Sequence, residues 1–533
     1  MTVALTQPRG WRLRLPARLD GRIGWGTVGT LAVIAVWQLV VGAGVVPSYV
    51  LPTPLQIVDA WVGALDLIAV NLPATLRTAG LGYLAGNAVA IALAALAGLW
   101  SPAEGLVSRL AIAAHCIPTI ALAPILLVVA PGELPGIILA ALGVFFATLV
   151  GMLTGMRYPD GRAVEAHHAF GGRRLTELVK VKLPYGMPGM FSGLLLGVPG
   201  AIVGALMSEY LMVGRGMGGA ITAAQEQLDA ARVWALCLTC ALVSALAFAA
   251  VGALQRAVLP WLAETSVSYA AAGARGASAH PVRDTVLGLL VFLSVACTLW
   301  WGALQVFGIS PYLGKTPLDV LEYLVVGPAA LAHTAELLGY LGTTLGNAAL
   351  GLALGTLVAV VLAAAFCAVP ALREAAMPTV LLARSVPLLA MIPAIALALG
   401  SGLLTVVALT ALLSFFPTLI TVMNALDAVP RDISDLARAY NASRADVTFR
   451  IRAVYAVPAV FQSLRITATG ALLGAIVAEW LASPGGIGYF VLRSASESKF
   501  VALWSAVVVV TLVSMVLYVI VVAVETAVRR RIL

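Results

Sequence analysis

The sequence predicts an all-α polytopic membrane protein with twelve transmembrane helices, arranged as two parallel six-helix repeats. Three observations lead to this fold class: the composition, the spacing of the apolar segments, and a recurrence of individual residues about 270 positions apart. The chain has 533 residues, of which 61% are hydrophobic and 11% charged, with a mean hydropathy of +1.01. Soluble proteins carry about 25% charged residues. The composition therefore excludes a soluble enzyme and a disordered chain.

Twelve apolar segments are long enough to cross a bilayer, which takes about 20 residues each. In the first half they are 25–46, 76–99, 107–130, 135–156, 189–212 and 232–257. In the second half they are 284–305, 342–368, 374–399, 402–425, 459–482 and 501–527. A segment rich in Ala, Gly and Ser separates the two sets and is typical of a linker. We therefore expect a cytoplasmic N-terminal segment, a first repeat, a cytoplasmic linker and a second repeat, at 1–24, 25–260, 261–283 and 284–533.

The two halves share residues as well as hydropathy. At an offset of 270, these residues of the first half recur in the second: Tyr185, Pro188, Phe191, Gly200, Gly204, Glu209, Leu211, Gly216 and Gly218. The pair Thr53-Pro54 recurs as Thr316-Pro317. Because each half has an even number of spans, both halves share one orientation, and a substrate pathway is expected between them.

Lysine and arginine are distributed as expected for cytoplasmic termini. With the N-terminus inside and twelve crossings, 25 of the 32 basic residues fall on the cytoplasmic side and 5 outside. The first apolar segment is too long for the hydrophobic part of a secretory signal and is expected to be a retained span. The net charge of +8 is then a signal of topology, not of nucleic-acid binding.

The longest cytoplasmic loop of each half lies between its fourth and fifth spans, at 157–188 and 427–458. The first loop contains Glu165-Ala166, then Gly171, then Leu183-Pro184. A carboxylate is favoured near a helix N-terminus, and glycine tolerates the positive φ at which many helices end. We therefore expect a short helix along the cytoplasmic face, suited to docking in a groove of another protein.

This pattern resembles the EAA loop of permease subunits of binding-protein-dependent ABC importers with type I transmembrane domains. The resemblance implies a coupling helix that sits in a cleft of an ATPase subunit. It assigns to this site, in the first loop, Glu165, Ala166, Gly171, Leu183 and Pro184. The second loop matches less closely, with Asp435, Ala437, Asn441 and Pro458 at the corresponding places.

The resemblance covers both halves and is closest to permeases for nitrate, sulfonates, taurine and thiamine-precursor-like compounds. It implies two ABC ATPase subunits, a periplasmic or lipid-anchored solute-binding protein, and a small-molecule substrate of these classes. It also implies a place in a bacterial inner membrane, in contact with lipid, and no cofactor. Because one chain already holds two permease halves, we expect one copy in each complex.

The chain is not expected to hydrolyse ATP itself. Gly314-Lys315-Thr316 resembles the end of a phosphate-binding loop, but that motif requires a glycine at position 309, which is Ile309. ATP hydrolysis is therefore assigned to the partner subunit.

Two other pairs are expected to be structural. Cys237-x-x-Cys240 has no His or carboxylate motif beside it, and a spacing of three places both residues on one helix face. His167-His168 are adjacent, so on a helix they point in different directions. We expect no metal site.

Charges within apolar segments are costly and commonly functional. Glu209 and Glu479 follow Pro188 and Pro458 by 21 residues, which is about 30 Å along a helix, near the outer surface. They are expected either at an outer gate or at the contact between the halves. Arg465 lies about 10 Å into its span. It either extends toward the inner headgroups or acts in the pathway asymmetrically, because its counterpart is Leu195.

The main alternative is an ion-coupled secondary transporter with twelve spans. Such a carrier is expected to hold acidic residues in the middle of its spans, where this sequence has almost none. A passive channel is a third alternative, but rings of charged pore-lining residues are missing from the sequence.

Overall fold

A computed structural model describes residues 31–48 except 33 and 45, 51–100, 107, 119–157, 161–211, 216–260, 281–384, 391–429, 433, 437, 439–440 and 452–532. Every regular element within these ranges is helical. The predictions for the basic N-terminal segment and for most of the linker at 261–283 fall outside them.

Four long helices in each half confirm the all-α polytopic class. In the first half they are α3 (Leu65–Leu99), α6 (Leu134–Arg157), α9 (Leu183–Leu211) and α11 (Ala230–Val258). In the second half they are α15 (Ala330–Ala368), α18 (Leu403–Asp427), α21 (Ala453–Ala482) and α23 (Phe500–Ile532). Seven of the eight are individually long and apolar enough to span a membrane, and α21 is bent by 44° between Arg465 and Thr467. These helices correspond to eight of the twelve predicted spans.

The first predicted span of each half is only partly represented by a long apolar helix. In the second half, α13 (Pro281–Val306) covers it, and the apolar part of that helix is Leu293–Val306. It begins inside the predicted linker. In the first half the helix is described only between 31 and 42.

The third predicted spans, 107–130 and 374–399, differ from the expectation of one continuous helix. The described part of the first is the 3₁₀-helix η1 (Thr119–Leu122) followed by α5 (Ala123–Val129). The second is divided into α16 (Pro370–Arg384) and α17 (Ile392–Leu399). Both α5 and α17 begin with a proline in the first turn. Proline has no N–H for a helix interior but fits a helix start, so these residues begin new helices.

The recurring Thr-Pro pairs each begin a short helix. Thr53 precedes α2 (Pro54–Gly63) and forms a capping box with Gln56. Thr316 precedes α14 (Pro317–Leu321) and forms one with Asp319, before the π-helix η4 (Glu322–Val326). The same local chemistry therefore produces the same structure in both halves.

The third-segment helices lie between the two halves and contact both of them. The helix α5, with η1, packs against α21 and α22 (Gly486–Ser496) of the second half. Reciprocally, α17 packs against α10 (Gly216–Glu226) and α11 of the first half. Buried Ile125 lies in an apolar cluster made mostly of second-half residues, and buried Ile392 lies in a cluster that contains residues of both halves, among them Leu206 and Leu409. Each of these helices therefore lies at the interface between the halves.

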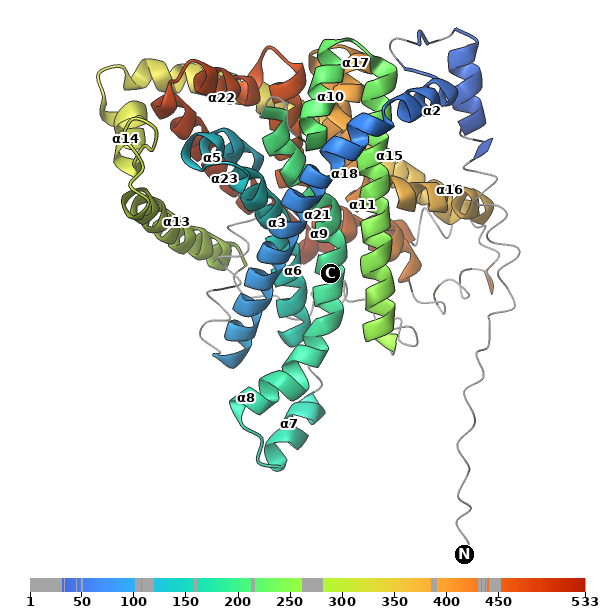
Figure 1. The fold of residues 1–533 in the computed structure, drawn as a ribbon. Helices are drawn as coiled ribbons and strands as arrows, with labels where there is room; N and C mark the ends of the chain where they lie inside the picture. Colours follow the sequence, from blue (N-terminus) through green and yellow to red (C-terminus); the bar gives the residue numbers. More distant parts are fainter. Residues whose placement is uncertain are drawn as a thin grey trace, which may run out of the picture.

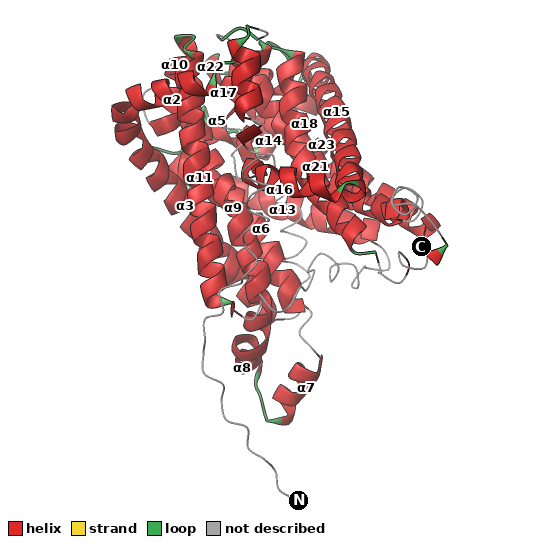
Figure 2. Cartoon of the chain, turned by 90° about the vertical axis from the view of Figure 1, so that its right-hand side faces the viewer, coloured by secondary structure: helices red, strands yellow, loops and turns green. Residues whose placement is uncertain are grey.

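The molecule has two distinct ends. At one end α7 (Gly161–Ala169) and α8 (Arg174–Glu177) project beyond the bundle (Figures 1 and 2). At the opposite end lie α2, α10, α17 and α22 (Figures 1 and 2). The long helix α9 runs between them, since it follows α8 and the π-helix η2 (Leu178–Lys182) and ends just before α10.

Candidate functional site

The first predicted coupling loop forms a compact helical projection. The helix α7 starts at Gly161, so Glu165 lies in its middle rather than at its first turn, and both Glu165 and Ala166 are exposed. The helix ends at Gly171, which has a φ of +75° and whose N–H donates to the carbonyl of His168 over 2.9 Å. The predicted role of Gly171 as a helix-ending residue with positive φ is therefore confirmed.

The histidines of α7 hold it against α8. Nε2 of His168 lies 2.9 Å from the Glu177 carboxylate, and Nε2 of His167 lies 3.1 Å from the Thr176 hydroxyl. Lys182 continues the chain of contacts: its Nζ is 3.1 Å from the other Glu177 oxygen and donates to the Gly98 carbonyl over 3.0 Å. Gly98 lies in the last turn of α3, so this polar chain connects α7 to a long helix.

Apolar side chains stand exposed around this projection. Phe170 is 93% exposed at the end of α7, and Leu175 and Val179 are also exposed. Leu183 and Pro184 lie where η2 passes into α9.

The second predicted coupling loop is described only in part. Asp435 and Asn441 lie outside the described residues. Ala437 is helical, and the carbonyl of Ala437 accepts from the N–H of Tyr440 over 3.2 Å. Pro458 lies inside α21.

At the opposite end, Glu209 is buried at the end of α9 and joins three helices. One of its oxygens accepts from the Thr75 hydroxyl of α3 over 2.8 Å and from the N–H of Gly218 of α10 over 2.9 Å. The Thr75 hydroxyl in turn accepts from the N–H of Met217 over 2.9 Å. The carboxylate and the threonine thereby use N–H groups at the start of α10 that have no partner within that helix.

The second half repeats this cluster. The Glu479 carboxylate accepts from the Thr344 hydroxyl over 2.7 Å and from the N–H of Gly488 over 3.2 Å. The Thr344 hydroxyl accepts from the N–H of Ile487 over 2.8 Å. Asn347 adds a donor to the other carboxylate oxygen, over 3.1 Å. All these partners belong to the same half as their carboxylate, so each cluster holds the outer helices of one half together.

Glycines Gly216 and Gly486 are required by these clusters. Their φ angles are +72° and +87°. A Cβ at Gly216 would overlap the Glu209 carboxylate, and one at Gly486 would overlap that of Glu479. The recurring Glu and Gly of the sequence are thus two parts of one structural unit, and Thr75 and Thr344 are the parts that sequence reasoning missed. They stand 269 residues apart, so the repeat offset was a usable signal.

The other predicted residues occupy structural positions. Arg465 of α21 lies 3.6 Å from the Glu525 carboxylate of α23 and is partly exposed. Cys237 and Cys240 are both buried in α11. The lysine of Gly314-Lys315-Thr316 donates to the carbonyl of Pro311 over 2.7 Å.

Two parts of the chain, residues 86–263 and 351–533, match the family of binding-protein-dependent transport system inner membrane components. Together they span more than half of the sequence. The chain is 28% identical to a Bacillus subtilis protein assigned to aliphatic sulfonates transport, SsuC, over 45% of this chain and 89% of that one. It is 28% identical to the formylaminopyrimidine transport permease protein ThiX of Halalkalibacterium halodurans, over 44% of this chain and 94% of that protein. It is 29% identical to the taurine transport system permease protein TauC of Escherichia coli, over 38% of this chain and 74% of that protein. Each of these aligned regions is shorter than half of this chain.

Proposed function

The chain belongs to the family of binding-protein-dependent transport system inner membrane components, and from this premise we propose that it is the fused, two-repeat permease of an ABC importer. The observation that carries this proposal is the double match to the family, one in each half. The interlocked helices α5 and α17 support it, because they make the two halves one unit with an interface between them. We assign the repeats to 25–260 and 284–533, with coupling loops at 157–188 and 427–458 and a linker at 261–283.

The projection formed by α7 and α8 is proposed to dock on a separate ATPase subunit. Its exposed Phe170 and Leu175 offer an apolar contact, and Gly171 sets the angle at which α7 ends. The polar chain from His168 through Glu177 and Lys182 to the end of α3 provides a mechanical connection from the docked helix to the transmembrane bundle. Ala166, Leu183 and Pro184 complete this site, and Asp435, Ala437, Asn441 and Pro458 form its counterpart in the second repeat.

The energy for transport is proposed to come from two such ATPase subunits. They bind one copy of this chain through its two coupling loops. The end with α7 and α8 then faces the cytoplasm, together with both chain termini, in agreement with the distribution of basic residues. An external solute-binding protein would dock at the opposite end, near α10 and α22. The chain itself performs no chemistry on the solute in this scheme.

The clusters around Glu209 and Glu479 are proposed as rigid parts of an outer gate. Each fixes the angle between a long helix and the short helix that follows it, because one carboxylate oxygen joins three helices. Movement of the repeats would carry α10 and α22 as rigid attachments. Arg465, through Glu525, would keep α21 and α23 together during that movement.

The substrate is proposed to be a small organic solute of the kind named for the relatives: a sulfonate such as taurine, or a thiamine-precursor-like pyrimidine. Nitrate is a further small anion of this class. The family membership favours this importer over an ion-coupled secondary transporter.

Reconstitution tests the proposal. The chain is co-expressed with an ABC ATPase and a solute-binding protein of this importer class, purified, and placed in proteoliposomes loaded with ATP. ATP-dependent uptake of radiolabelled taurine or of a pyrimidine, absent without the binding protein, is the expected result. Uptake driven by a proton or sodium gradient without ATP would overturn the proposal, and two copies of this chain in the purified complex would overturn the stoichiometry.

A further inference from the structure

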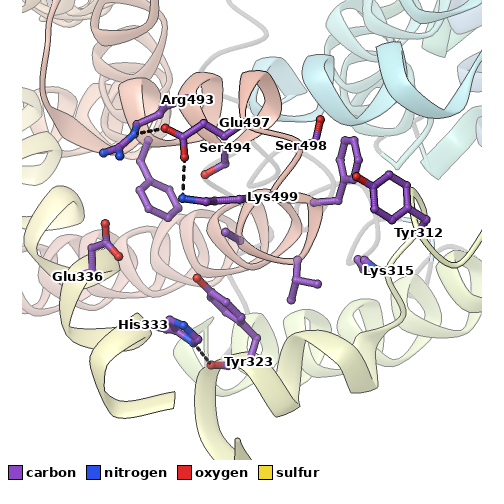
Figure 3. Close-up of a pocket in the computed structure, with 14 residues that line it drawn as sticks. Tyr312, Lys315, Tyr323, His333, Glu336, Arg493, Ser494, Glu497, Ser498 and Lys499 are labelled. Atoms are coloured by element: carbon purple, nitrogen blue, oxygen red, sulfur yellow. Dashed lines mark hydrogen bonds and ion pairs between the residues drawn. The ribbon is translucent and has the colours of Figure 1, made fainter. Parts of the chain in front are cut away.

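A cavity of about 490 Å³ lies beside the start of α23, in the second repeat (Figure 3). Residues from the segment before α14, from η4 and α15, from α22 and from the first turn of α23 line it. It is separate from the coupling loop and from the two carboxylate clusters. Its volume lies within the range of about 300–1,000 Å³ typical of small-molecule pockets.

The cavity carries more cationic than anionic side chains. Lys315, Arg493 and Lys499 line it, against Glu336 and Glu497. Glu497 lies between two of the cations, 2.7 Å from Nε of Arg493 and 2.7 Å from Nζ of Lys499. The hydrogen bond from Lys499, and to a lesser degree the one from Arg493, lowers the pKa of the Glu497 carboxyl. The carboxylate therefore stays ionised and holds both cationic side chains in place. In Figure 3, Glu336 and Lys315 lie on opposite sides of the cavity.

A largely buried serine also lines this cavity. Ser494 is only 3% exposed, and its side chain lines the cavity next to Lys499 (Figure 3). A hydroxyl at this place can donate to a ligand or accept from one.

In the first repeat, the helix equivalent to α23 has a carboxylate bound at its N-terminus. There α11 begins after Asp229, whose carboxylate accepts from the N–H of Arg232 over 3.0 Å. At the offset of 270, Asp229 corresponds to Lys499 and Arg232 to Ala502, which lines the cavity. No acidic residue stands in the first turn of α23. A built-in carboxylate at the start of α11 is thus replaced, at the start of α23, by a cation and an open cavity.

Two further differences between the repeats point the same way. Arg493 and Ser494 correspond to Ala223 and Ala224 of the first repeat. The backbone is the same at both places, since Leu228 and its counterpart Ser498 have φ angles of 55° and 57°. The second repeat therefore carries two polar side chains where the first repeat has alanines, and both line the cavity.

We propose that this cavity binds the oxyanion group of a small ligand, a carboxylate, sulfonate or phosphate. Lys315 and Lys499 supply charge, the Ser494 hydroxyl and the first N–H groups of α23 supply donors, and Tyr312 and Phe500 form an apolar wall. The proposal goes beyond the transport function and does not depend on it.

Binding is measured on the full chain in nanodiscs of pure phosphatidylcholine, without ATPase or binding protein. Isothermal titration with ethanesulfonate, acetate and ethyl phosphate is compared with titration by ethylammonium. We expect saturable binding of at least one anion and none of the cation. Absence of saturable binding by all three anions overturns the proposal and leaves the importer proposal untouched, because no transport is measured.

Variants that copy the first repeat provide the specific test. Lys499→Asp supplies the carboxylate that Asp229 supplies in the first repeat, and is expected to abolish anion binding. Ser494→Ala copies Ala224 and is expected to weaken binding about tenfold, the loss expected for one hydrogen bond to a charged group. Arg232→Gln, which removes a cation from the first turn of α11 in the first repeat, is the control and is expected to bind as the wild type does. If Lys499→Asp and Ser494→Ala also bind as the wild type does, the proposal is wrong.

The same oxyanion chemistry occurs in free solutes and in phospholipid headgroups. Adding phosphatidylglycerol to the nanodiscs separates these sources. A severalfold rise in the apparent Kd for the anion assigns the cavity to a lipid headgroup, whereas an unchanged Kd assigns it to a soluble anion.

Discussion

The hydroxyl of Thr344 lies 2.7 Å from the carboxylate of Glu479, and the same hydroxyl accepts the N–H of Ile487 over 2.8 Å. One threonine therefore connects α15 to both α21 and α22, as Thr75 connects α3 to α9 and α10 in the first repeat. Four residues, two in each repeat, hold six helices at one end of the molecule.

Thr344→Val is expected to destabilise the protein by about 1–3 kcal/mol, because it removes one of the hydrogen bonds to the buried Glu479 carboxylate and leaves the buried N–H of Ile487 without its partner. Thr344→Ser keeps the hydroxyl and is expected to lose little. The neighbouring Thr343 is exposed and provides a matched control, since Thr343→Val removes the same hydroxyl outside the cluster. Thermal unfolding in detergent measures all three, and equal losses for Thr343→Val and Thr344→Val would contradict the role of the cluster.

Gly486→Ala is expected to lower both stability and transport. A Cβ there overlaps the Glu479 carboxylate, and the φ of +87° adds about 1–2 kcal/mol of backbone strain. Gly485, with a φ of −147° and open space around its Cα, is the matched control. Purified yield and uptake rate of Gly486→Ala and Gly485→Ala are compared, and a Gly486→Ala protein with wild-type stability would show that the carboxylate can move aside.

Gly171→Ala is expected to reduce uptake severalfold while leaving the amount of protein in the membrane unchanged. The strained φ of +75° would shift the end of α7, which has open space around it and therefore moves without unfolding the bundle. Gly132 has a similar φ of +62° and equally open surroundings, at a position outside the coupling loop. Gly132→Ala is therefore expected to transport normally, and equal uptake by the two variants would argue against a coupling role for α7.

Phe170→Ser is expected to reduce the amount of ATPase that copurifies with the permease at least several-fold. The side chain is 93% exposed, so its removal costs the isolated chain no buried apolar contact. Phe307, 77% exposed at the end of α13, is the control for removing an exposed phenylalanine elsewhere. Copurification that falls equally for Phe170→Ser and Phe307→Ser would place the docking surface elsewhere.

The sequence predicts the long helices and the repeat well, because both can be recognised from the pattern of residues alone. Apolar segments of about 20 residues and the offset of 270 identify eight long helices, the Thr-Pro helix starts and the paired Glu and Gly residues. The third spans were predicted as continuous because apolar content hides a break, although Pro124 and Pro393 begin the new helices α5 and α17.

The partners of the carboxylates depend on contacts between distant segments and were missed. Thr75 stands 134 residues before Glu209, and threonines are common in apolar helices, so only its recurrence as Thr344, 269 residues later, singles it out. The cavity was missed for a related reason: Lys315, Arg493 and Lys499 come from separate elements. Comparison of the two repeats, position by position, is the signal that would have found it, since Asp229 and Lys499 differ in sign.

The position of α5 and α17 between the halves has a consequence for how the molecule is assembled. A repeat made on its own would leave its third-segment helix without the contacts that this helix makes with the other repeat, so pairing accompanies folding. Joining both repeats in one chain replaces a search through the bilayer by an effective concentration of about millimolar, and fixes the ratio of the two at one to one. It also means that each repeat need fit only one partner, never a copy of itself. A difference such as Lys499 in the second repeat at the position of Asp229 in the first can then exist in one repeat alone. In a symmetric dimer both copies would carry the same residue.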